Sequence, residues 1–112
     1  MPYTADYASA PPARADIDAD TGLLVLEFGA PWCGHCQLAQ AAIAEVLGAA
    51  AEVRHLKIED GRGRPLGRSF RVKLWPTLLF LRDGEEQARL VRPREAREVA
   101  HALGALLPPG SS

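Results

Sequence analysis

Two short stretches in which almost every residue is apolar place the strongest constraint on the fold of this chain. They are residues 23–28 and residues 77–82. A strand that is exposed on one face alternates apolar and polar residues, so an unbroken apolar run is typical of a strand covered on both faces. Helices must therefore cover both sides, and a chain of 112 residues is long enough to supply them within one domain. We expect a single domain of the α/β class spanning residues 1–112.

The pattern around these runs predicts the remaining elements. Residues 53–58 are expected to form a third strand, and Asp83-Gly84 is a dipeptide favoured in hairpin turns, so residues 86–91 should return as an antiparallel edge strand. Together the strands predict a central mixed sheet of four to five strands with helices on both faces. Apolar spacings and turn residues predict helices over residues 11–19, 33–48, 65–70 and 94–107.

The two ends of the chain and the final helix carry weaker patterns. Residues 1–10 are expected to form a weakly ordered arm, either irregular or a short edge strand, and residues 108–112 a disordered tail. In the final helix the predicted buried stripe is Ala96, Val99, Ala100, Leu103 and Leu107.

Composition excludes some classes of partner. The formal net charge of -1 gives no general attraction for nucleic acid or for an anionic membrane. No stretch approaches the roughly 20 apolar residues of a membrane span, and the first residues lack the basic start and apolar run of a secretory signal. We therefore expect a cytoplasmic monomer that recognises its partners locally.

The two cysteines, Cys33 and Cys36, directly follow the first apolar run. The helical period begins at this point, so Cys33 falls at a helix N-terminus, where unpaired N–H groups and the helix dipole favour a thiolate. Cys36 lies three residues on and points towards the core stripe through Ala39 and Ile43. We predict that Cys33 attacks a disulfide and that Cys36 resolves the resulting mixed disulfide.

Two other roles for the cysteine pair remain as alternatives. One is an inert structural disulfide, and the other is half of a zinc site completed by His35, His55 or His101. Zinc ribbons usually need two such pairs, and this chain has one. We therefore expect no metal and no cofactor beyond a redox-active disulfide between Cys33 and Cys36.

From about residue 10 to residue 107 the chain resembles the thioredoxin superfamily. Three segments carry the resemblance: residues 23–36, then Trp75-Pro76-Thr77, then Asp83-Gly84. The sequence Cys33-Gly34-His35-Cys36, preceded by Trp32, is similar to the active-site motif of protein disulfide isomerases, whereas typical thioredoxins have proline in place of His35. The resemblance implies a thioredoxin-like fold and a thiol-disulfide oxidoreductase that acts on protein disulfides.

The resemblance also implies roles for a second segment. Pro76 matches a cis proline that faces the active-site cysteines in thioredoxins. Its effect would be to turn the backbone of Trp75 outward, so that this segment, with Thr77, binds an extended substrate by strand addition.

Glu27 matches a buried acid of the family. A carboxylate is costly to bury, which favours its protonated form, so Glu27 could accept the proton of Cys36. The alternative is a structural charge satisfied by His55 or Lys57. His55 stands where thioredoxins usually have a lysine, which leaves open whether the acid has a fixed cationic neighbour.

Three departures from the family pattern alter the rim of the site. His35 beside Cys33 would stabilise the reduced thiolate, which predicts a more oxidising couple than that of thioredoxin. Trp75 replaces a branched aliphatic residue, and Arg92 followed by Pro93 replaces a glycine that lets substrate approach. Four arginines lie nearby in the sequence: Arg62, Arg64, Arg68 and Arg71. Together with these changes they predict a narrow site that favours acidic partners, unless the arginines form an ordinary solvated face.

Two classes of function follow from the sequence. The first is an enzyme that reduces or exchanges disulfides in other proteins, with electrons from a donor of the thioredoxin-reductase type. The second is a binding or chaperone-like module of the same fold, in which the redox state of the cysteine pair regulates the affinity for a partner. A glutathione-using glutaredoxin is a third alternative, although its usual proline-tyrosine pair between the cysteines is absent.

Overall fold

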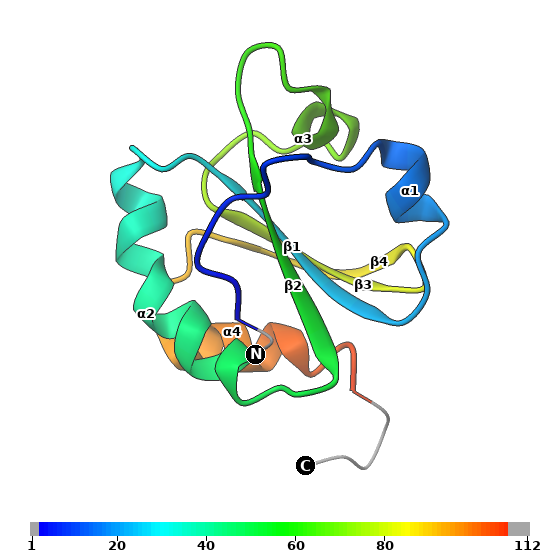
Figure 1. Cartoon of the computed structure of the whole chain (residues 1–112). Coiled ribbons are helices and arrows are strands. Elements are labelled where there is room, and N and C mark those ends of the chain that lie inside the picture. Colours follow the sequence, from blue (N-terminus) through cyan, green and yellow to red (C-terminus); the bar gives the residue numbers. More distant parts are fainter. Residues whose placement is uncertain (1–2, 108–112) are drawn as a thin grey trace.

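The computed structural model describes residues 3–107 and contains four helices and four strands in alternating order along most of the chain (Figure 1). The elements are α1 (Arg14–Asp18), β1 (Leu23–Gly29), α2 (Gly34–Gly48), β2 (Val53–Glu59), α3 (Pro65–Ser69), β3 (Thr77–Arg82), β4 (Glu85–Val91) and α4 (Ala96–Leu103). The expected disordered tail, residues 108–112, lies outside the described residues.

The sheet has the strand order β2-β1-β3-β4. β1 is parallel to β2 and antiparallel to β3, and β4 is antiparallel to β3. The predicted mixed sheet is therefore confirmed, with four strands. The hairpin between β3 and β4 turns at Asp83 and Gly84, which both have positive φ angles of 50° and 80°, as a tight turn between right-twisted strands requires.

Helices cover both faces of this sheet, as the apolar runs predicted (Figure 1). On one face, side chains of β1 and β3 such as Val25 and Phe80 pack against α2 and α4. On the other face, Leu26 and Phe28 pack with residues of α1 and α3. Because successive side chains of a strand alternate between faces, Glu27 lies on the same face as Val25, towards α2.

The final helix is shorter than predicted, and its buried stripe differs. It ends at Leu103 and is followed by tight turns, in which the N–H of Leu106 donates to the carbonyl of Leu103 at 2.9 Å. These turns place Leu106 in the core, and Ala102 is buried while Ala100 is exposed. The prediction of Ala100 and Leu107 as core positions was therefore wrong, because Ala100 lies on the solvent side of the helix and Leu107 lies beyond the residue where the helix ends.

Over residues 3–10 the N-terminal arm has no helix and forms one isolated parallel bridge, between Tyr7 and Lys57 of β2. The N–H of Ala8 also donates to the carbonyl of Lys57 at 2.8 Å. Figure 1 shows the arm, in dark blue, crossing beside β2 on its way to α1. The sequence pattern predicted only a weakly ordered arm, but side chains of the arm reach the functional site described below.

Candidate active site

Cys33 and Cys36 lie where β1 ends and α2 begins, and both are free thiols. Cys33 is the N-cap residue of α2, and its Sγ accepts a hydrogen bond from the backbone N–H of Cys36 at 3.3 Å. A sulfur at this position meets unpaired N–H groups and the positive end of the helix dipole, both of which favour a thiolate. The predicted placement of Cys33 at the helix N-terminus is confirmed.

The two sulfurs have unequal surroundings. Cys33 is 8% exposed and lines an open groove, whereas Cys36 is only 2% exposed and lies against the end of β1. Burial raises the pKa of the Cys36 thiol to about 12, and the hydrogen bond with Cys33 and the charge of Glu27 act in the same direction. A Cβ on Gly29 would lie 2.5 Å from the Sγ of Cys36, so only glycine leaves space for this thiol. Cys36 therefore needs a base before it can act as a nucleophile.

Glu27 is fully buried and is held by two hydrogen-bond donors. Its Oε1 lies 2.9 Å from Nε2 of His55, and its Oε2 accepts from Nε2 of Gln40 at 2.7 Å. The same Gln40 nitrogen donates to the backbone carbonyl of Cys36 at 2.9 Å. The side chain of Gln40 thus links Glu27 to Cys36. Gln40 was not among the residues predicted from the sequence.

The hydrogen bonds of His55 assign its tautomer. The backbone N–H of Thr4 donates to Nδ1 at 2.8 Å, and a backbone N–H can only donate, so Nδ1 must present a lone pair. The ring proton then lies on Nε2 and is donated to Glu27. This arrangement makes His55 a neutral partner, so the family's lysine is replaced here by a hydrogen-bond donor without a charge.

The nearest fixed positive charge belongs to Lys57, which is also buried. Its Nζ donates to Oε1 of Gln40 and to the carbonyl of Ala5, both at 3.0 Å. Lys57 therefore reaches Glu27 only through Gln40. Of the two partners expected for the acid, His55 makes the direct contact and Lys57 does not.

The groove beside Cys33 has a volume of about 360 Å³. Trp32 and Trp75 form its walls, with ring centroids 5.5 Å apart in an edge-to-face arrangement, and Trp32 is 72% exposed. The sequence predicted most of the lining residues and missed two of them, Lys73 and Leu74; the complete set is Trp32, Cys33, Gly34, His35, Lys73, Leu74, Trp75 and Arg92. Trp32, Cys33, Gly34 and His35 of the motif therefore meet Trp75 and Arg92 around one opening, whereas Cys36, Pro76 and Thr77 do not line it.

The peptide bond between Trp75 and Pro76 is cis, as the resemblance implied. The carbonyl of Trp75, however, accepts a hydrogen bond from Nε of Arg92 at 2.8 Å, so one of the two lone pairs of this backbone acceptor is already engaged. The prediction for Thr77 needs correction. Its side chain is buried, and its hydroxyl donates to the carbonyl of Leu74 at 2.6 Å. Thr77 therefore shapes the loop beside the groove and is not placed to touch a substrate.

A second, smaller pocket of about 230 Å³ adjoins this groove through Lys73 and Trp75. Arg64 and Arg68 line it, while Asp60 accepts a hydrogen bond from the indole N–H of Trp75 at 2.8 Å. Two of the four arginines singled out from the sequence thus lie next to the groove. They add positive charge to the side of the opening that Trp75 forms, although Glu59, 3.7 Å from Arg64, and Asp60 in the same pocket offset part of it.

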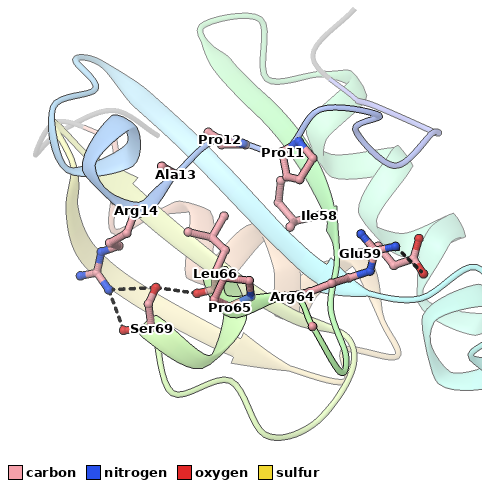
Figure 2. A pocket seen from close by; sticks show the side chains of 11 residues that line it. Pro11, Pro12, Ala13, Arg14, Ile58, Glu59, Arg64, Pro65, Leu66 and Ser69 are labelled. Atoms are coloured by element: carbon pink, nitrogen blue, oxygen red, sulfur yellow. Dashed lines mark hydrogen bonds and ion pairs between the residues drawn. The ribbon is translucent and has the colours of Figure 1, made fainter.

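A separate cavity of about 370 Å³ lies between the segment leading into α1, the end of β2, and α3 (Figure 2). Figure 2 shows Arg14 and Ser69 at one end and Glu59 and Arg64 at the other. No cysteine lines it. Chemistry at Cys33 is therefore served by the groove and not by this cavity.

Within residues 3–107 no three or more His, Cys, Asp or Glu side chains gather closely enough to hold a metal ion. Among the described helices, none has both the length and the apolar character needed to cross a membrane.

Comparison with known proteins supports the relationship that the geometry indicates. The family model named Thioredoxin matches residues 13–105. The solved structure of thioredoxin 2 from Pseudomonas aeruginosa PAO1, in its reduced form, is 53% identical with a TM-score of 0.83, over 93% of this chain and 96% of that one.

Curated relatives match over shorter stretches. Thioredoxin H2-1 from Oryza sativa subsp. japonica is 35% identical over 63% of this chain and 51% of its own length. Protein disulfide-isomerase A2 from Pongo abelii is 42% identical over 71% of this chain and 16% of its own length. The chain thus spans about half the length of the first relative and a small part of the second. With the cysteine pair at the start of α2, a cis Trp75–Pro76 bond whose Trp75 packs against the cysteines, and the family match over most of its length, this chain belongs to the thioredoxin family of thiol-disulfide oxidoreductases.

Proposed function

We propose that this chain reduces or exchanges disulfides in other proteins, with Cys33 as the attacking thiol and Cys36 as the resolving thiol. The observation that carries the proposal is the difference between the two sulfurs. Cys33 caps a helix and lines an open groove, whereas Cys36 is buried with a raised pKa. A reactive thiol at the edge of a groove paired with a more deeply buried one is the arrangement that stepwise thiol-disulfide exchange needs.

The reaction proceeds in two displacements. The Cys33 thiolate attacks one sulfur of the substrate disulfide, which releases one substrate thiolate and leaves Cys33 bound to the other sulfur. Cys36 then loses its proton and attacks the Sγ of Cys33, so that the second substrate thiolate leaves and a disulfide forms between Cys33 and Cys36. The substrate gains two electrons, and the protein must receive two from a dithiol donor before the next cycle.

Glu27 is the proposed acceptor of the Cys36 proton. It lies on the α2 side of β1, its charge contributes to the raised pKa of Cys36, and Gln40 connects its carboxylate to the backbone of Cys36. Its two other contacts, to His55 and Gln40, keep the carboxylate oriented in a buried site.

Extended polypeptides with acidic residues near the reacting cysteine are the proposed substrates. The groove is open at the surface, two tryptophans line it, and Lys73, Arg92 and the neighbouring Arg64 and Arg68 supply positive charge. Such a field favours acidic partners chiefly through the association rate and is weakened by salt. The electron donor is proposed to be a thioredoxin-reductase type of enzyme. The cytoplasmic and monomeric expectations stay predictions, which cell fractionation and sedimentation would test.

The direct test is reduction of insulin with dithiothreitol as the electron source. Turnover should be lost in Cys33→Ser, and a wild-type protein no faster than that variant would refute the enzymatic proposal. Cys36→Ser should trap substrates as mixed disulfides through Cys33. Equal capture of the same partners by the Cys33→Ser, Cys36→Ser double variant would instead support the binding-module alternative.

A further inference from the structure

The phenol of Tyr7 lies beside the buried thiol of Cys36, and we propose that its hydroxyl stabilises the Cys36 thiolate during the resolving step. This inference rests on the proposed function, because it assigns a second side chain to the same displacement. Tyr7 belongs to the N-terminal arm, so the segment with the weakest sequence pattern would contribute to the chemistry of the central motif.

Gly29, the last residue of β1, brings these two groups together. A Cβ at this position would lie 2.5 Å from the Sγ of Cys36 and 3.1 Å from the hydroxyl of Tyr7. Both groups therefore border the same small volume, and the thiol of Cys36 contributes to the raised pKa of Tyr7. A larger residue at position 29 would occupy that volume and separate them.

Contacts with β2 hold Tyr7 in this place. Its backbone forms the bridge with Lys57, and the next residue, Ala8, donates to the carbonyl of Lys57. The ammonium group of Lys57 lies 4.7 Å from the centre of the Tyr7 ring, a favourable cation-π arrangement. The ring is thus fixed by a buried strand, although the arm itself has no regular structure.

The protonation state of Tyr7 defines what it can do. Burial, together with the nearby Cys36 and Glu27, raises the pKa of Tyr7 strongly. The phenol therefore keeps its proton at neutral pH and can donate a hydrogen bond, but it cannot accept the proton of Cys36. Its role differs from that of Glu27: the carboxylate takes the proton, and the hydroxyl stabilises the sulfur anion that remains.

This donor matters because the Cys36 thiolate is otherwise unfavourable. A backbone hydrogen bond from Ala30 offsets only part of the effect of burial, and the pKa of Cys36 is still raised to about 12. In the displacement, the Cys36 sulfur bonds to the Sγ of Cys33 while the bond from Cys33 to the substrate sulfur breaks, and the substrate leaves as a thiolate. A donor at Cys36 lowers the energy of the attacking anion without taking part in these bond changes.

The test follows the two displacements separately with the aryl disulfide dithiobis(nitrobenzoate). The reduced wild-type protein should release one equivalent of nitrothiobenzoate when Cys33 attacks and a second when Cys36 resolves. In Tyr7→Phe the ring over Lys57 is retained and only the hydroxyl is lost. We expect an unchanged first phase and a second phase slowed by about tenfold or more at neutral pH, the effect of one hydrogen bond to a charged group.

The pH profile separates this role from a structural one. Tyr7→Phe should need about one more pH unit to reach the wild-type rate of the second phase, since higher pH restores the thiolate. Ser9→Ala is the control, because Ser9 is an exposed residue of the same arm and this substitution likewise removes only a hydroxyl. Its second phase should keep the wild-type pH profile.

The possible outcomes distinguish the two proposals. If the wild-type protein releases only one equivalent, the proposed function fails. If it releases two and Tyr7→Phe resolves at the wild-type rate throughout the pH range, the role of Tyr7 alone is wrong. Equal slowing of both phases in Tyr7→Phe, with no shift of the pH profile, would also overturn that role.

Discussion

Glu27→Gln tests the proposed proton acceptor at the resolving step. A pKa of about 12 means that about one Cys36 thiol in 10⁵ is ionised at pH 7 without help from a base. A well-placed general base contributes about 10²- to 10⁴-fold. We therefore expect the second release of nitrothiobenzoate at pH 7 to slow by about 10²-fold or more in Glu27→Gln.

Two side effects of this substitution can be estimated from the contacts of Glu27. The new amide must face either His55 or Gln40 with its N–H₂ group, although both neighbours already donate to this position. One buried donor without a partner costs about 1–3 kcal/mol of unfolding free energy. Loss of the negative charge acts in the opposite direction on Cys36, but it is the smallest cause of its raised pKa, and burial is the largest.

The dependence of the second phase on pH provides the decisive measurement. Without a base the rate should follow the thiolate fraction, and it should rise about tenfold for each pH unit between pH 7 and 9. Wild type should change much less over this range, and Glu27→Asp should recover part of the rate. Equal pH profiles for wild type and Glu27→Gln would refute Glu27 as the base, even if the variant were less stable.

Four further outcomes follow from the same geometry. Gly29→Ala should lose about 1–3 kcal/mol of unfolding free energy and slow the second phase, because its methyl group overlaps the Cys36 sulfur; unchanged urea denaturation would contradict this. In the reduced protein, the pKa of Cys36 is raised from 9.0 to about 12. The folded state therefore keeps a proton that the unfolded state loses above pH 9, and stability should fall as pH rises from 9 to 12. The fall should exceed that of Cys36→Ser by up to about 1.4 kcal/mol per pH unit, and parallel curves would contradict it. His35→Pro should lower the reduction potential by tens of millivolts, within the roughly 90 mV that separates thioredoxin from protein disulfide isomerase; an equal or higher potential would be the opposite result. Arg92→Ala frees the carbonyl of Trp75, so kcat/KM for a neutral disulfide peptide should rise about fivefold for one hydrogen bond of about 1 kcal/mol, and a fall would refute that role.

Much of the fold could be predicted because its signals are local. The apolar runs of β1 and β3 specify strands that must be covered on both faces, and Asp83-Gly84 specifies the hairpin between β3 and β4. The helical spacing of apolar residues after Cys33 specifies α2 and the face of α2 that packs against the sheet. The prediction for α4 failed beyond Leu103, since a helical period does not reveal where turns replace the helix.

The groove was predicted only in part, and the prediction came from the motif and the resemblance and not from local periodicity. Trp32, Cys33, Trp75 and Arg92 were named from the motif and from the resemblance, and they meet around one opening. Thr77 was misplaced, because sequence proximity to the cis proline does not show which face of β3 a side chain occupies. The hydrogen bond to the carbonyl of Trp75 had no sequence signal, as it depends on the side-chain conformation of a residue 17 positions away.

The sequence by itself determined the cysteine pair, its place at a helix N-terminus and the acid in the neighbouring strand, because short-range spacing encodes each of them. Only the tertiary structure decided what surrounds Cys36 and Glu27. Tyr7 and Thr4 reach the site from an arm without periodicity, and Thr4 contacts His55 across 51 positions of sequence. Such contacts arise when β2 pairs with β1 and the arm crosses beside it, so no local pattern of residues records them.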